Sequence, residues 1–101
     1  MIVEFTIIPI GKGESISEYV SQVVDIVDDS GIDYKLTPMG TIVEGEWDEV
    51  MDLIKKCHHH VKEQSNRVDT RIVIDDRKGK KNRITGKIKS VESKLNREVK
   101  K

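Results

Sequence analysis

Apolar and polar residues first alternate along this chain and then recur at helical spacing. Residues 2–10 alternate in the way typical of a strand with one apolar face. Between residues 16 and 27 the apolar positions recur three and four residues apart, which predicts an amphipathic helix. Ser15, with Glu18 three residues later, is expected to cap the start of this helix. Gly31 is expected to end it in a left-handed conformation.

A hairpin and a second helix follow. Residues 33–37 and 41–46 predict two short strands, joined by a turn that contains proline and glycine. Residues 47–61 return to helical spacing, and Trp47 is expected to anchor this helix in the core. Residues 68–76 alternate again and predict a fourth strand.

The order of these elements defines a fold class. A narrow apolar stripe over residues 84–99 predicts a third helix, which follows a basic loop. The order β-α-β-β-α-β plus a helix is that of an α+β, ferredoxin-like sandwich, with a four-stranded antiparallel sheet and two helices on one face. We expect this domain to span residues 1–77, and a basic C-terminal loop and helix to span residues 78–101.

The sheet face that the two helices leave open is predicted to carry aliphatic and charged side chains together. Glu44 lies on this face in a central strand, where a charge needs a partner or a ligand. We expect Arg71 to pair with Glu4 or Glu44 across strands, and a second subunit to cover the face.

The loops are expected to meet at the two ends of the sheet. We expect residues 11–17 to lie beside residues 45–47, where two helix N-termini would suit an anionic or strongly polar group. The turn at residues 37–40 is expected to approach residues 75–77 at the other end.

The zero net charge hides two opposed blocks. Residues 1–76 hold 7 Lys and Arg against 16 Asp and Glu, a balance of −9, and residues 77–101 hold 11 against 2, a balance of +9. Such blocks are expected to meet within one subunit or between subunits, although a solvated basic helix is the alternative. Nucleic-acid binding is disfavoured because the basic block has no aromatic residue to stack on a base.

Other features narrow the function class. The single cysteine excludes an internal disulfide, no apolar run approaches the roughly 18 residues of a membrane span, and the first residues lack the pattern of a signal peptide. We therefore expect a cytoplasmic protein.

In the run Cys57-His58-His59-His60 only Cys57 and His60 have a spacing that could share a metal ion. No set of residues has a spacing that demands catalysis, so we expect no enzyme, no metal and no cofactor.

Four segments resemble the thiamine-binding protein family, whose tandem members are the YkoF-like thiamine- or hydroxymethylpyrimidine-binding proteins. They are residues 15–20, 34–41, 44–50 and 71–77, and the combination of Thr-Pro-Met-Gly-Thr with Glu-Gly-Glu-Trp is the most specific part. The resemblance implies a ferredoxin-like fold, a homotetramer built as a dimer of dimers, and non-catalytic binding of thiamine or its hydroxymethylpyrimidine half, as a carrier or sensor.

The resemblance also implies a set of ligand-binding residues: Ser17, Thr37, Met39, Thr41 and Glu44. The carboxylate of Glu44 can accept a hydrogen bond from the exocyclic amine of an aminopyrimidine, and Met39 can pack on a flat ring. Thr41 and Glu44 should face opposite sides of their strand, so one pocket is not expected to hold both. The alternative function is a regulatory or assembly module that binds another effector at subunit interfaces.

Overall fold

The computed structural model describes residues 1–13, 16–79 and 83–100. Its elements follow the predicted order: β1 (Ile2–Pro9), α1 (Ser17–Ser30), β2 (Asp33–Thr37), β3 (Gly40–Glu44), α2 (Trp47–Lys62), β4 (Val68–Asp75) and α3 (Arg83–Leu95). The expected cap at Ser15 lies outside the described residues. Gly31 ends α1 with a φ of 78°, as predicted.

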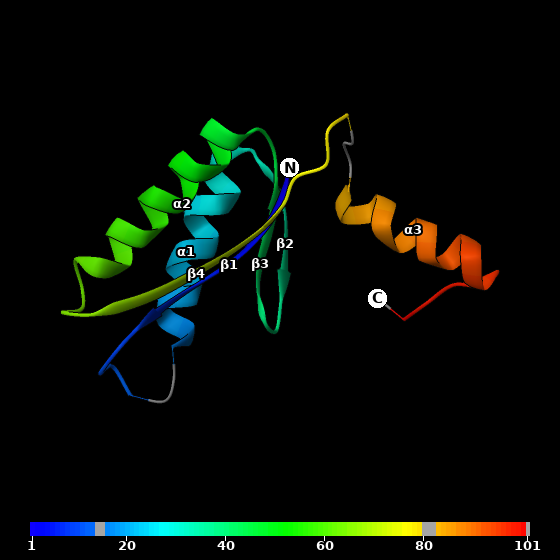
Figure 1. The fold of residues 1–101 in the computed structure, drawn as a ribbon. Coiled ribbons are helices and arrows are strands. Elements are labelled where there is room, and N and C mark those ends of the chain that lie inside the picture. Colours follow the sequence, from blue (N-terminus) through cyan, green and yellow to red (C-terminus); the bar gives the residue numbers. More distant parts are fainter. Residues whose placement is uncertain (14–15, 80–82, 101) are drawn as a thin grey trace.

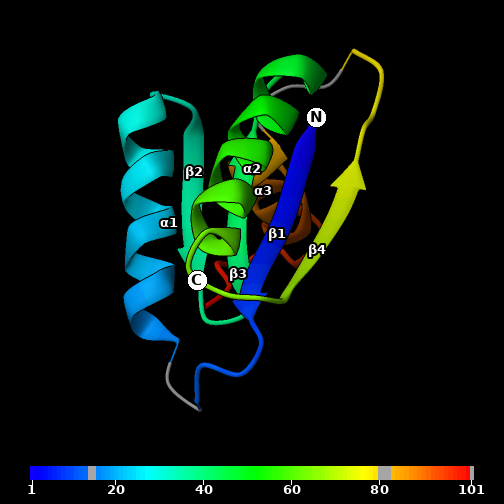
Figure 2. The same ribbon diagram turned by 90° about the vertical axis from the view of Figure 1, so that its left-hand side faces the viewer.

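The four strands form one antiparallel sheet in the order β2-β3-β1-β4. Both α1 and α2 cover one face of this sheet, and α3 lies on the opposite side (Figure 1). Viewed from the helical side, α2 crosses in front of the sheet while α1 runs beside β2 (Figure 2). This is the ferredoxin-like α+β arrangement that the sequence predicts.

The core lies between the sheet and the two helices. Val3, Phe5 and Ile7 of β1 are buried there, as their alternation predicts, with Val43 of β3 beside them. Buried side chains of the helices complete the core: Val23, Val27, Val50, Leu53, Ile54, Cys57 and Val61.

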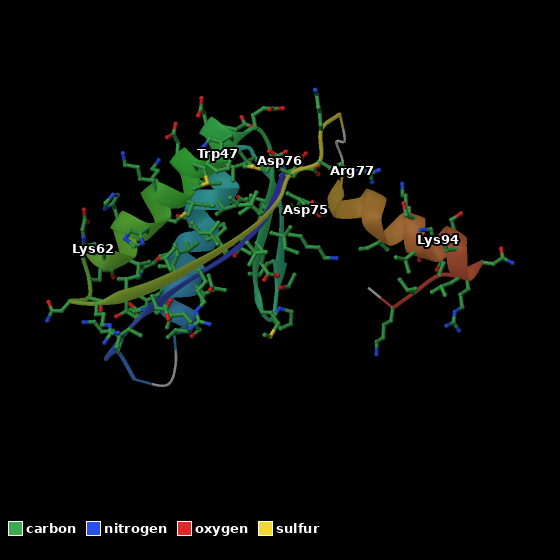
Figure 3. All side chains as sticks on the ribbon, in the orientation of Figure 1. Trp47, Lys62, Asp75, Asp76, Arg77 and Lys94 are labelled. Atoms are coloured by element: carbon green, nitrogen blue, oxygen red, sulfur yellow. The ribbon has the colours of Figure 1, made fainter. Side chains whose placement is uncertain are left out.

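Trp47 does not anchor α2 in the core. Its side chain is 53% exposed at the first position of the helix (Figure 3). The core positions of α2 begin with Val50, one turn later. Trp47 faces outward because the apolar stripe of α2 begins one turn further along the helix.

The structure contradicts the prediction that residues 11–17 lie beside residues 45–47 and that the turn at residues 37–40 approaches residues 75–77. The reason is that β1 and β3 pair in antiparallel orientation. Ile2 pairs with Glu44, so the start of β1 lies beside the end of β3. Ile2 also pairs with Asp75 of β4. Residues 45–47 therefore lie at the same end of the sheet as residues 75–77 (Figure 3), while the start of α1 lies at the other end with the β2–β3 turn.

The predicted cross-strand ion pair is also wrong. Arg71 lies opposite Thr6 in the sheet register, and its guanidinium pairs with Asp69 of its own strand at 3.2 Å. Two residues along one strand point to the same face, so this neighbour is within reach. The pair is largely exposed and adds little to stability.

The third helix touches the body of the domain through β3 and then extends away from it (Figure 1). Its first apolar residues, Ile84 and Ile88, are half-buried, whereas Val91 and Leu95 are exposed. Within residues 1–13, 16–79 and 83–100, no helix is long and apolar enough to cross a membrane.

Candidate functional site

A small pocket lies at the end of the sheet where the β2–β3 turn meets the start of α1. We call it the hairpin pocket, and its volume is about 260 Å³. Its lining comes from β1, α1 and the hairpin: Thr6, Ile7, Ile8, Ile16, Val20, Val23, Thr37, Pro38, Met39, Gly40 and Thr41. Most of these side chains are aliphatic, with three hydroxyl groups among them. This composition is typical of sites for small, weakly polar ligands.

The pocket exists because β1 is longer than the strand beside it. The pairing of β1 with β3 ends at Phe5 and Thr41, whereas β1 continues to Pro9 along β4. Beyond Phe5 the sheet therefore has a notch on the β3 side of β1. The first turn of α1 and the β2–β3 turn surround this notch.

The hydroxyl of Thr37 is used to build the turn. It donates a hydrogen bond to the carbonyl of Gly40 at 2.8 Å, and it accepts from the backbone N–H groups of Met39 and Gly40 at 3.2 and 3.1 Å. This local bonding fixes the β2–β3 turn, as threonine commonly does. Thr37 thus shapes the pocket and has no hydroxyl proton left for a ligand.

The hydroxyl of Thr41 is in the opposite situation. Thr41 is only 5% exposed, lines the hairpin pocket, and makes no side-chain hydrogen bond with any residue that the structure describes. Among the described residues no fully buried side-chain nitrogen or oxygen lacks a hydrogen-bond partner, so the Thr41 hydroxyl must keep some contact with the space of the pocket. A ligand or a water there would provide its hydrogen-bond partner. Thr41 is therefore the buried polar side chain best placed to recognise a ligand.

Two other predicted residues have different positions. Met39 lies at the rim of the hairpin pocket, where its side chain is 79% exposed and free to pack on a ligand. Ser17 is exposed at the start of α1 and is outside the pocket lining, although its neighbour Ile16 belongs to it. The structure thus brings together Thr37, Met39 and Thr41.

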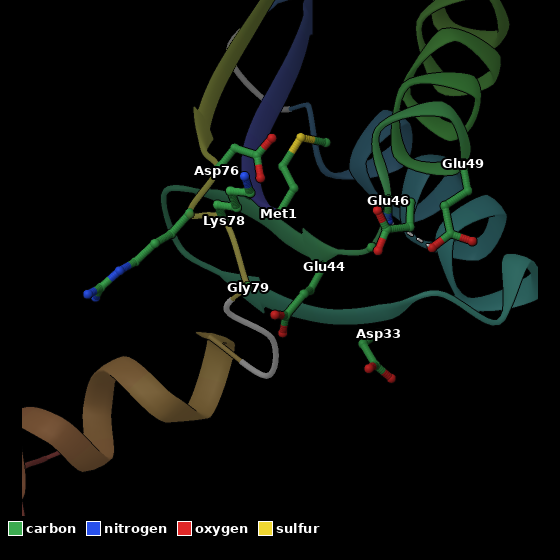
Figure 4. Close-up of a pocket in the computed structure, with 10 residues that line it drawn as sticks. Met1, Asp33, Glu44, Glu46, Glu49, Asp76, Lys78 and Gly79 are labelled. Carbon is green, nitrogen blue, oxygen red and sulfur yellow. Dashed lines mark hydrogen bonds between the residues drawn. The ribbon is translucent and has the colours of Figure 1, made fainter.

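Glu44 lies at the other end of the sheet, in a second pocket of about 410 Å³. We call this the acidic pocket; five carboxylates line it together with Arg77, Lys78 and the N-terminal residue (Figure 4). The five are Asp33, Glu44, Glu46, Glu49 and Asp76. Thr41 and Glu44 therefore belong to different pockets, as the strand alternation predicts.

The carboxylate of Glu44 has a partner within the chain. It accepts a hydrogen bond from the backbone N–H of Ile84, in the first turn of α3, at 3.4 Å. A carboxylate at this place satisfies an amide that the helix leaves without an internal acceptor, and it interacts favourably with the helix dipole. The charge in the central strand thus helps to hold α3 against the sheet.

The acidic pocket also contains the start of α2. The Glu49 carboxylate accepts a hydrogen bond from the backbone N–H of Glu46 at 3.1 Å (Figure 4). The Glu46 carboxylate in turn accepts from the backbone N–H of Glu49, which completes a capping box. Gly45 makes room for this arrangement, because a β-carbon at that position would collide with the Glu49 carboxylate.

The cysteine and histidine run of α2 is divided among separate surroundings. Cys57 is fully buried, and burial raises the pKa of its thiol to about 11. His58 is 2.6 Å from the Thr70 hydroxyl, and His60 is 2.9 Å from the Gln22 side-chain oxygen. Across the described ranges no three His, Cys, Asp or Glu side chains are grouped closely enough to hold a metal ion.

Sequence reasoning missed the β1 and α1 residues of the hairpin pocket: Thr6, Ile7, Ile8, Val20 and Val23. A signal for them was available in the strand lengths. A first strand of nine residues beside a third strand of six must leave part of one edge unpaired. The antiparallel direction would then have placed that edge next to the β2–β3 turn.

The fold and the pockets define the class: a ferredoxin-like domain with a small, mostly apolar pocket at one end of its sheet and an acidic pocket at the other. The family model described as thiamine-binding protein matches residues 3–92. This chain belongs to that family.

Relatives cover nearly the whole chain. The UPF0045 protein YqgV of Bacillus subtilis is 40% identical over an alignment of 100 positions, and the alignment covers 93% of this chain and 96% of that protein. The UPF0045 protein MJ1052 of Methanocaldococcus jannaschii is 35% identical over 91 residues, or 90% of this chain and 91% of that protein.

Solved structures show the same fold. The crystal structure of MJ1052 matches with a TM-score of 0.83 and 36% identity, over 89% of this chain and 93% of that one. A Thermotoga maritima protein, provisionally assigned to thiamine biosynthesis or salvage, matches with a TM-score of 0.78. Its identity is 23%, over 89% of this chain and 96% of that one, so it supports the fold alone.

Proposed function

We propose that this protein binds thiamine or its hydroxymethylpyrimidine half in the hairpin pocket, and that it acts as a carrier or sensor without catalysing a reaction. The observation that carries the proposal is the hydroxyl of Thr41, which lines a small, mostly apolar pocket and bonds to none of the described residues, in a chain of the thiamine-binding protein family. The pocket volume of about 260 Å³ suits one substituted ring, so the pyrimidine is the part that enters.

The decisive experiment is isothermal titration with hydroxymethylpyrimidine and with thiamine. We expect saturable binding of both, and an absence of heat at high micromolar ligand would contradict the proposal. Thr41→Val keeps the shape of the side chain and removes the hydroxyl, so we expect affinity to fall about fivefold to tenfold, the usual worth of one hydrogen bond.

A matched control is Thr70→Val. Thr70 lies on β4, contacts His58 and does not line the hairpin pocket. This variant should lose some stability and keep its affinity for the pyrimidine. Equal affinity of Thr41→Val and the parent protein would show that the Thr41 hydroxyl does not contact the ligand.

The family resemblance further supports a homotetramer, built as a dimer of dimers. The open sheet face carries the exposed Val73, and α3 carries the exposed Val91 and Leu95. Apolar surface of this kind is commonly covered by another subunit. The proposal includes no nucleic acid and no membrane as a partner, and it places the protein in the cytoplasm.

These exposed surfaces also favour the second candidate, an assembly or regulatory module whose effector binds between subunits. Native mass spectrometry of the purified protein separates the two candidates. A co-purified pyrimidine favours the first, and a different retained metabolite favours the second.

A further inference from the structure

The backbone of β1 has a free edge inside the hairpin pocket. In an antiparallel sheet the N–H and C=O of one residue point to the same neighbouring strand, and those of the next residue point to the other. Two hydrogen bonds fix this alternation in β1. Gly45 donates to the carbonyl of Met1 on the β3 side, and Ile10 donates to the carbonyl of Arg67 on the β4 side.

The alternation directs the backbone of odd-numbered residues of β1 toward β3. Phe5 is the last residue whose partner, Thr41, belongs to β3. The next odd residue is Ile7, which would face Met39, but Met39 lies in the turn and not in a strand. Neither the N–H nor the C=O of Ile7 has a hydrogen bond on that side with any described residue.

Ile7 also lines the hairpin pocket, as Thr41 does. We infer that the N–H and C=O of Ile7 read the edge of a planar heterocycle that carries an amino group next to a ring nitrogen. The N–H of Ile7 donates to the ring nitrogen, and its C=O accepts from the amino group. The ring thus takes the place that a further residue of β3 would occupy in the sheet.

This inference rests on the proposed function and names the chemical feature that the site selects. In the ring with an oxo group in place of the amine, donor and acceptor are exchanged, because the oxygen accepts and the ring nitrogen carries a hydrogen. In the same pose each group of the ring would face a like group of Ile7 and leave it without a partner. The site should therefore prefer an aminopyrimidine to the corresponding ring with an oxo group in place of the amine.

The test replaces one backbone amide by an ester. Chemical synthesis in two segments, ligated at the single Cys57, allows an ester linkage before Ile7 that removes its N–H and keeps its side chain. The control is an ester before Tyr34 of the edge strand β2. Tyr34 pairs with Val43, whose backbone is directed toward β1, so the N–H of Tyr34 points outward from the sheet.

Titration with hydroxymethylpyrimidine should show about fivefold to tenfold weaker binding for the ester at Ile7 than for the ester at Tyr34. An analogue with C–H in place of the ring nitrogen beside the amine should bind both proteins equally. It should also bind the unmodified chain about tenfold more weakly than hydroxymethylpyrimidine does, a comparison that needs no synthetic protein.

Equal affinity of the two ester proteins for hydroxymethylpyrimidine, or equal affinity of the unmodified chain for the two ligands, would overturn the role of Ile7 and leave the proposed function standing. Failure of the unmodified chain to bind any of these pyrimidines would overturn both.

Discussion

Thr37 and Thr41 line the same pocket but have different roles, which follow from their hydrogen bonds. Thr37 uses its hydroxyl three times within the β2–β3 turn, whereas Thr41 is buried beside the pocket with no such bond among the described residues. Both were predicted as ligand-binding residues on equal grounds. Their difference depends on the sheet register, which directs Thr41 toward the helices and leaves Thr37 at the turn.

Replacement of Thr37 should destabilise the protein. Thr37→Val removes one donor and one acceptor of the turn, so we expect the free energy of unfolding to fall by about 1–2 kcal/mol. Urea unfolding measures this change. Thr37→Ser keeps the hydroxyl and should remain close to the parent protein, and a Ser variant as unstable as the Val variant would contradict the assigned bonds.

Cys57 should make stability fall at alkaline pH. Burial raises the pKa of its thiol from 9.0 to about 11, so the unfolded chain loses this proton first as the pH rises. Fewer bound protons in the unfolded state mean that unfolding becomes easier, by about 1 kcal/mol between pH 8 and pH 10. The measurement compares urea midpoints of the parent protein and Cys57→Ala at both pH values.

The alanine variant isolates the thiol, because every other titrating group is the same in the two proteins. Its loss of stability between pH 8 and pH 10 should be smaller by that amount. Parallel pH dependences would show that the thiol of Cys57 titrates at its ordinary pKa when buried.

At the scale of elements, the sequence predicts which segments form strands and helices, but it does not predict how the ends of these elements are placed. Periodicity identified β1, the hairpin and the helices, because burial of one face imposes a regular spacing on each of them. It could not place Trp47, since the first turn of a helix extends beyond the core. The predicted contacts between loops are wrong for another reason: β3 runs antiparallel to β1, as the fold class implies, so the end of β3 lies beside the start of β1 and not beside its end.

The start of α2 depends on the small size of Gly45. A β-carbon at this position meets the Glu49 carboxylate and Val50, so Gly45→Ala should displace Glu49 and break the capping box. We expect a loss of about 1 kcal/mol in urea unfolding.

Glu49 provides the control for that prediction. Glu49→Ala should cost a similar amount, and the double variant should cost little more than either single one, because both remove the same interaction. Glu49→Gln retains an acceptor oxygen and should be nearly neutral. Additive losses in the double variant would show that Gly45 acts independently of the cap.

For the whole molecule, the opposed charge blocks meet only in part. Glu44 holds the first turn of the basic helix α3, and Arg77 and Lys78 line the acidic pocket. The rest of α3 leaves the domain with apolar residues exposed, and the molecule measures 48 × 29 × 21 Å as a result. The charge pattern predicts that the acidic and basic blocks meet. It does not predict that the contact is confined to the start of α3, because that depends on how the helix packs against the sheet.

The exposed half of α3 should therefore act in assembly and not in folding. Val91→Ser combined with Leu95→Ser removes apolar surface that the domain itself does not cover, so the unfolding midpoint should stay within about 0.5 kcal/mol of the parent. The mass measured by light scattering should fall, since burial of two such side chains against another subunit contributes roughly 3 kcal/mol or more.

Lys89→Ser with Lys94→Ser is the matched control on the same helix, and it should retain the assembled mass at moderate salt. An unchanged mass in the apolar variant, with a reduced mass in the lysine variant, would show that charge and not apolar contact joins the subunits through α3.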